Sequence, residues 1–122
     1  MDSILTFAEP GILLPSELEA PFGVFLDGED DFWSDDDLLC RSCQNLINKG
    51  CRWFVCYGPR SEAIHDRIDD VIVEQGYEGI VTTYHADESE AEVAQFFKDV
   101  ALIEMKAGLI LVSNRSTWAR LF

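Results

Sequence analysis

The sequence predicts an α/β fold, a small three-layer α/β/α sandwich built on a mainly parallel sheet of four strands. Short, almost continuous apolar runs alternate along the chain with segments whose apolar residues recur at helical spacing. This alternation is typical of parallel sheets that helices cover on both faces. With 122 residues, of which 48% are hydrophobic, the chain is long and apolar enough to fold as one domain, residues 1–122.

The N-terminal segment, residues 1–21, has no clear hydrophobic period. Prolines at positions 10, 15 and 21 divide it into short apolar stretches. We expect an irregular segment that packs on the domain, and its first stretch, residues 4–7, can add an edge strand to the sheet.

The regular pattern begins after Pro21. Residues 22–26 form an apolar run that ends in Asp27-Gly28, which predicts a buried strand and a turn. Ser34 precedes three aspartates, so we expect a serine-capped helix with acids in its first turn. Its apolar stripe predicts a helix that ends at Gly50.

The second half repeats this order. Residues 52–57 predict a strand ended by Gly58-Pro59, and residues 61–75 a helix ended by Gly76. Residues 79–84 predict a third strand. Asp87 and Glu90 have the spacing of a capping box and predict the start of a third helix, which Gly108 closes. Residues 109–112 predict the last strand, and residues 116–122 a short helix or an edge segment. Strand residues that we expect to be almost inaccessible are Val24, Phe54, Val55, Ile80, Val81, Ile110 and Leu111.

Charge is distributed unevenly along the chain. The first forty residues contain eleven acids and no Lys or Arg, so they carry −11 of the net charge of −14. Seven of these acids lie within residues 27–37, around Phe32 and Trp33. Aromatic rings inside an anionic run are typical of a contact surface, because rings supply desolvated area and carboxylates attract a basic partner. A solvated surface that only favours solubility is the alternative interpretation.

The same charge argues against direct binding to nucleic acid or to an anionic membrane, because both require a basic face. Met1 is followed by Asp2 without a basic region, and Glu104 and Lys106 interrupt the longest apolar run. We therefore expect no secretory signal, no membrane span and a cytoplasmic location. The four cysteines lack the usual zinc spacing, so we expect reduced structural thiols, without metal or other cofactor.

A ligand site is the second possibility that the sequence offers. In open parallel sheets, ligands bind beyond the carboxyl ends of the strands. Four residues with suitable chemistry for acid–base work or phosphate binding follow the predicted strands: Asp27, Arg60, His85 and Arg115. Each has a simpler structural role, such as a turn, a cap or a locally bonded histidine.

The clustered acids after the first strand resemble the acidic pocket of bacterial receiver domains, which share the alternating α/β plan. That resemblance would imply a phosphoacceptor aspartate after the third strand, where this chain has Tyr84-His85-Ala86, and a lysine in the last loop, which here contains Arg115. The calcium-loop pattern is also unmet. A specific magnesium or calcium site is therefore not favoured.

Binding is the function that the sequence favours over catalysis, because the candidate catalytic groups are scattered. Immunity proteins neutralise toxins, often nucleases whose clefts are basic, and this chain is similar to that class in size and charge. We expect a bacterial immunity protein with a basic, toxin-like protein partner, and we expect Phe32 and Trp33 to be its desolvated anchor. The predicted contact residues are Asp27, Glu29, Asp30, Asp31, Phe32, Trp33, Asp35 and Asp36. A small enzyme or nucleotide binder, and a structural adaptor subunit, remain alternatives.

Overall fold

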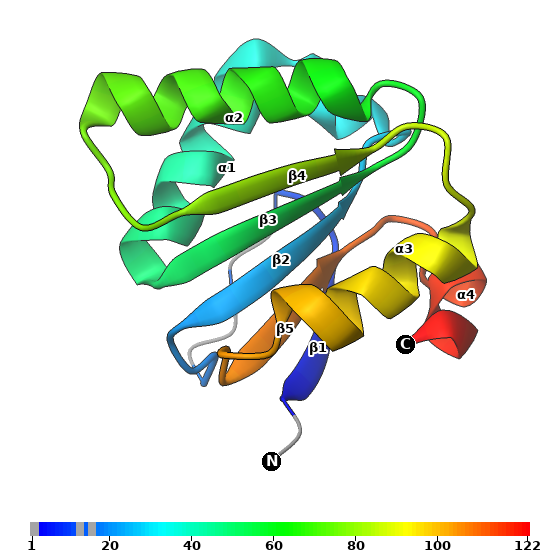
Figure 1. Cartoon of the computed structure of the whole chain (residues 1–122). Helices are drawn as coiled ribbons and strands as arrows, with labels where there is room; N and C mark the ends of the chain where they lie inside the picture. Colours follow the sequence, from blue (N-terminus) through cyan, green and yellow to red (C-terminus); the bar gives the residue numbers. More distant parts are fainter. Residues whose placement is uncertain (1–2, 12–13, 15–16) are drawn as a thin grey trace.

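A five-stranded parallel sheet forms the centre of the computed structural model, which describes residues 3–11, 14 and 17–122. The strands lie in the order β1-β5-β2-β3-β4, and every neighbouring pair is parallel (Figure 1). They are β1 (Ile4–Ala8), β2 (Phe22–Asp27), β3 (Cys51–Tyr57), β4 (Val81–His85) and β5 (Ala107–Leu111).

Helices cover both faces of this sheet (Figure 1). On one face, α1 (Asp36–Lys49) and α2 (Ser61–Gln75) cover an apolar cluster that takes in Val24 and Leu26 of β2. On the other face lie α3 (Glu90–Phe96), its π-helical continuation η2 (Phe97–Ala101), and the C-terminal α4 (Arg115–Trp118) with η3 (Ala119–Leu121). Phe25 of β2 belongs to this second cluster. Alternate residues of a strand thus enter opposite cores, which confirms the three-layer α/β/α sandwich.

The sheet has one strand more than the four expected in the main pattern. Ile4–Ala8 pairs in parallel with β5, from Ile4 beside Ala107 to Ala8 beside Leu111. Its residues are half-buried or exposed, and its sequence does not have the continuous run of apolar residues that marks the inner strands. The edge strand that the N-terminal stretch can form is therefore present. The prediction of an irregular segment is wrong for these five residues.

Burial follows strand position. Val24, Phe54, Val55, Ile110 and Leu111 are between 0% and 3% exposed, as predicted. The prediction is wrong for Val81, which is 42% exposed, and for Ile80, which is half-buried before β4 begins. β4 is the edge strand next to β3, so a β-branched sequence there need not lie in the core.

Two predicted helix starts are displaced by one or two residues. Asp35, not Ser34, caps α1, and its Oδ1 accepts a hydrogen bond from Leu38 N at 3.1 Å. Ser34 instead ends the 3₁₀ turn η1 (Asp31–Ser34). The capping box of α3 is formed by Ser89 and Glu92 rather than by Asp87 and Glu90. Overlapping capping patterns in one acidic stretch compete, and tertiary packing selects among them.

Other boundaries agree with the pattern to within two residues. Gly50 and Gly76 end α1 and α2 in the left-handed conformation that favours glycine. The third helix is shorter than predicted, since η2 ends at Ala101. None of the described helices combines the length and the apolar character that crossing a membrane requires.

Candidate functional site: an acidic groove at the carboxyl edge of the sheet

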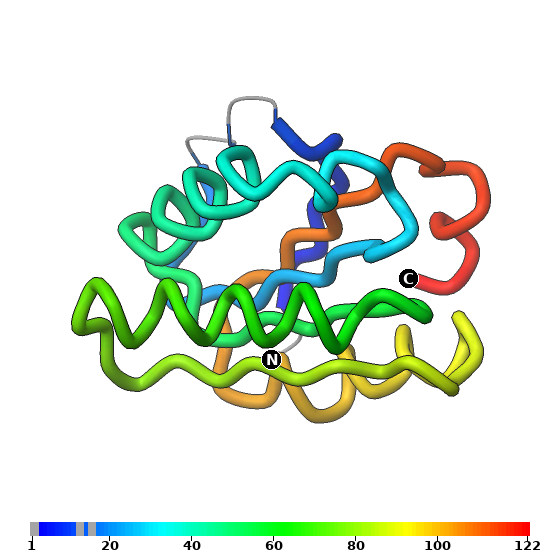
Figure 2. The backbone as a smooth tube through the Cα atoms, turned by 90° about the horizontal axis from the view of Figure 1, so that it is seen from above, coloured from blue at the N-terminus to red at the C-terminus, as the bar shows by residue number. Residues whose placement is uncertain are grey.

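The acidic segment, residues 27–37, connects β2 to α1 at the carboxyl edge of the sheet. Figure 2 shows the segments after β2, β3 and β5 together at this end of the molecule, on the right of the view. Gly28 N donates to Tyr57 O at 2.8 Å, and a Cβ at Gly28 would lie only 2.5 Å from that oxygen. Glycine therefore allows the acidic segment to begin close against β3.

Hydrogen bonds from outside the acidic segment fix its conformation. Asp27 ends β2, and its Oδ2 accepts a hydrogen bond from Trp118 Nε1 of α4 at 3.3 Å. Asp30 caps η1 by accepting from Phe32 N at 3.0 Å, and its other oxygen accepts from the Ser113 hydroxyl. These contacts tie the acidic segment to the chain that follows β5. Its carboxylates are thus presented by a fixed backbone.

The aromatic pair inside the acidic segment is largely buried. Trp33 is 4% exposed and belongs to the core cluster under α1 and α2, while Phe32 is half-buried against that cluster. The two rings lie edge to face at 4.8 Å. Trp33, which we expect with Phe32 to be the desolvated anchor, therefore offers a partner little surface, because burying its large apolar surface in the core is favourable. Phe32 retains some accessible surface.

A groove of about 640 Å³ lies between the first turns of α1 and α2, beside the acidic segment. Apolar side chains that line it include Trp33, Leu39, Pro59 and Ile64. Its charged lining residues are Asp36, Arg60, Glu62 and Arg67. The indole Nε1 of Trp33 is buried and has no hydrogen-bond partner among the described residues. A mainly apolar lining with a few charged side chains is the usual composition of a pocket that receives a ligand or an anchoring side chain.

Two arginines, Arg60 and Arg67, partly neutralise the carboxylates beside the groove. Arg67 Nε lies 2.7 Å from Asp36 Oδ1, and a second guanidinium nitrogen lies 3.3 Å from Oδ2, so this pair is bidentate. The hydrogen bond from Arg67 lowers the pKa of Asp36. Arg60 donates to Glu29 O at 2.8 Å and lies 3.9 Å from Asp31. Of the seven carboxylates in residues 27–37, only Asp31 and Asp36 take part in ion pairs within the described part of the chain.

Sequence reasoning did not identify Arg67, Glu62 or Trp118 as parts of this region. Arg67 lies 31 residues from Asp36, and no local spacing connects them. Trp118 lies 91 residues from Asp27. Such residues meet only because whole helices and strands pack together, so a single sequence contains no local signal for these contacts.

The four residues of the predicted ligand site lie at or just after the carboxyl ends of four different strands, and each has its own partners. Arg60 contacts the acidic segment, whereas the Arg115 guanidinium lies 5.0 Å from the centre of the Phe7 ring. His85 is 7% exposed, with Nδ1 at 2.9 Å from Glu88 and Nε2 at 3.1 Å from Thr83. Of the four, the 640 Å³ groove is lined only by Arg60. The chain places these residues at one edge of the sheet without bringing them to one pocket.

The cysteines contribute to the core instead of to this site. All four are free thiols, and Cys43, Cys51 and Cys56 are buried, while Cys40 is half-buried. Burial raises the pKa of Cys43 to about 12, and it also raises the pKa values of Cys51 and Cys56. These thiols are therefore protonated at neutral pH and unreactive. Within the described residues, no cluster of three His, Cys, Asp or Glu side chains could hold a metal ion.

The family model described as a domain of unknown function, DUF7684, matches residues 5–116. The chain belongs to the DUF7684 family. The match includes all five strands except Ile4, and it includes the acidic segment and the groove. Neither a curated protein nor a solved structure matches this DUF7684 domain significantly.

Proposed function

We propose that this DUF7684 domain binds and inhibits a basic protein, and that it acts as an immunity protein against a nuclease-type bacterial toxin in the cytoplasm. The observation that carries the proposal is the acidic segment, which has seven carboxylates within residues 27–37 and lies beside a largely apolar groove. Within the described part of the chain, only two of these carboxylates take part in ion pairs. Nucleases bind phosphate backbones through basic clefts, so such a cleft is complementary in charge to this surface.

The two parts of the site have different roles in this proposal. The carboxylates attract the basic partner and raise the rate of encounter. The groove receives an apolar or basic side chain of the partner. This side chain loses its hydration as it packs on Leu39 and Ile64, and the contact sets the lifetime of the complex. Trp33 forms part of the groove wall, so its contribution is to the shape of the groove.

Coexpression with a toxin tests the proposal. The toxin to use is the product of the gene directly upstream, if that gene encodes a nuclease. We expect the domain to restore bacterial growth and to form a complex with the purified toxin. Asn at positions 30, 31, 35 and 36 should lower the association rate about tenfold or more at low salt and flatten its salt dependence. Asn also caps helices, so the caps at Asp30 and Asp35 are retained.

A matched control removes the same number of charges elsewhere. The control variant carries Glu9→Gln, Glu19→Gln, Asp87→Asn and Asp99→Asn, all exposed positions outside the groove. It should reduce the association rate much less than the variant in the acidic segment. Equal effects of the two variants would mean that net charge alone acts. No protection from the toxin would contradict the proposal itself.

A small enzyme or phosphate binder at the carboxyl edge is the competing function. The groove favours it to the extent that an anionic ligand could contact Arg60. In that case Arg60→Ala or His85→Ala abolishes activity, whereas the four Asn substitutions leave it intact. A structural adaptor would show neither effect and would instead remain in a stable complex.

A further inference from the structure

The outer edge of the sheet, at β4, has no part in the function proposed above. β4 pairs with β3 on one side and is the last strand in the sheet order. Gly58 N, just after β3, donates to His85 O at 3.2 Å, so the backbone groups of His85 face β3. Successive residues of a strand direct these groups to alternate sides. The N–H and C=O groups of Thr82 and Tyr84 therefore face outward.

Apolar side chains flank this open edge. Val81 and Tyr84 of β4 are each 42% exposed, and Ile103, after η2, is 73% exposed. A hollow of about 420 Å³ adjoins the strand, and its lining includes Trp53, Val81, Val100, Ile103 and Met105. β4 itself contains no Lys or Pro, two residues that protect many natural edge strands from pairing. An added strand could bury alternate side chains in this hollow.

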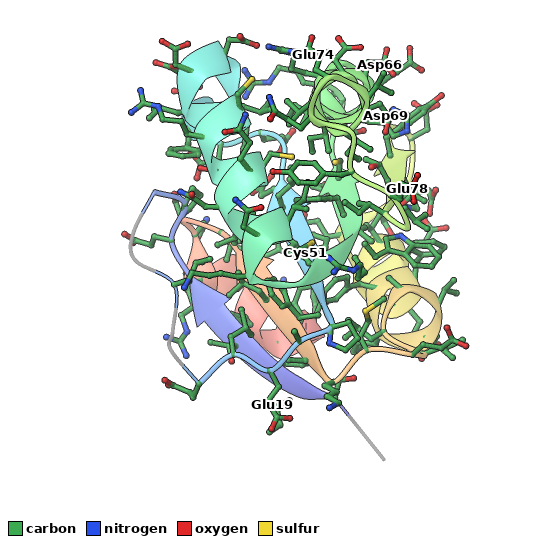
Figure 3. The ribbon with its side chains drawn as sticks, turned by 90° about the vertical axis from the view of Figure 1, so that its left-hand side faces the viewer. Glu19, Cys51, Asp66, Asp69, Glu74 and Glu78 are labelled. Atoms are coloured by element: carbon green, nitrogen blue, oxygen red, sulfur yellow. The ribbon has the colours of Figure 1, made fainter. Side chains whose placement is uncertain are left out.

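The charges next to the edge are mainly acidic. A hydrogen bond with Glu62 of α2 raises the pKa of the Tyr84 hydroxyl. His65 packs its ring 4.9 Å from the Tyr84 ring and contacts Asp66 at 2.9 Å and Asp69 at 3.5 Å. Figure 3 shows Asp66 and Asp69 on α2 and Glu78 on the loop before β4. Arg52 and Glu104, one of each sign, line the hollow.

These charges decide between occupants of the edge. A second copy of the chain would pair β4 with β4 and bring two acidic flanks together, and each copy has a net charge of −14. Like charges placed opposite each other across strands are destabilising. An extended segment with lysine or arginine at alternate positions would instead place its cations by Glu62 and Asp66.

We propose that the outer edge of β4 binds an extended basic segment of a partner protein, which adds to the sheet as a sixth strand. The inference deepens the proposed function and rests on it for the identity of the partner, since a basic toxin would supply the segment. The edge contact itself can be tested without the toxin. Of the residues named for this edge, only Glu62 also lines the 640 Å³ groove, which lies between α1 and α2.

A synthetic peptide serves as the probe. The peptide has eight residues that alternate valine and lysine, with both ends blocked, and it is compared with a copy that carries N-methyl groups at every second residue. We expect the first peptide to slow hydrogen exchange of the Thr82 and Tyr84 amides, measured by NMR. N-methylation of the paired face should weaken binding about tenfold for each hydrogen bond lost. A peptide with glutamate in place of lysine should not bind.

Variants of the protein test the charge argument. Asp66→Asn with Asp69→Asn, two positions outside the 640 Å³ groove, should weaken binding of the lysine peptide several-fold, whereas the control pair Asp70→Asn with Glu74→Gln should not. Equal affinity for the methylated peptide, or exchange that slows elsewhere but not in β4, would overturn the proposal. Concentration-dependent dimers with protected β4 amides would also overturn it, in favour of a second copy. If the toxin does not bind but the peptide result stands, only the proposed function fails.

Discussion

Trp33 provides the sharpest test of the structure, because its sequence context suggests exposure and its position is buried. Trp33→Ala removes an indole that is 4% exposed and packs in the cluster under α1 and α2. Truncation of a buried aromatic side chain costs about 3–5 kcal/mol, since it removes apolar contacts and leaves a cavity. For a domain of this size, that loss lowers the melting temperature by about 10–20 °C.

Trp33→Phe is the matched variant. It keeps an aromatic ring and removes the indole N–H, which is buried without a partner in the described part of the chain. Removal of an unpaired buried donor is favourable, so we expect this variant to lose less than about half of the alanine effect. Urea unfolding followed by circular dichroism measures both free energies of unfolding. An alanine variant with an unchanged urea midpoint would refute the burial of Trp33 and return it to the contact surface.

Four further outcomes are expected. Phe54→Ala, in the central strand β3, should lower the free energy of unfolding by about 3–5 kcal/mol in urea melts, because Phe54 is 1% exposed. Ser89→Ala should cost about 1 kcal/mol in the same melts and Asp87→Ala almost nothing, because Ser89 forms the capping box. A thiol reagent should modify Cys43 far more slowly in the native protein than after unfolding, and four thiols should react in denaturant. The pKa of Asp36 is lower in the folded state, so its contribution to stability is present above the unfolded pKa and lost as pH falls through the folded pKa. Asp36→Asn should reduce the acid dependence of the urea midpoint below about pH 4.

The inner sheet and the two long helices could be predicted from the sequence because their signals are local. A buried parallel strand needs a continuous apolar run, and residues 22–26 provide one. Helix ends are chemically marked, as Gly50 and Gly76 show. The predicted α/β sandwich is therefore confirmed, although β1 contributes a further strand that has only a weak pattern.

Exposure at the sheet edge and in the acidic segment could not be predicted in the same way. Val81 lies in a β-branched run like those of the core, yet it is exposed because no strand follows β4 in the sheet. Trp33 lies among aspartates, yet it is buried because α1 and α2 cover it. In both cases the local sequence determines the type of element, while its neighbours determine which surface remains accessible.

The sequence by itself determined the alternation of strands and helices and the acidic character of residues 27–37. The tertiary structure alone decided which acids meet cations, as with Asp36 and Arg67, and which residues surround the groove. It also decided that Asp27, Arg60, His85 and Arg115 have separate partners. The physical reason is the distance along the chain over which each interaction acts. Hydrophobic period, capping and charge density act within a few residues, whereas ion pairs and pockets form between elements that only the order of the strands brings together.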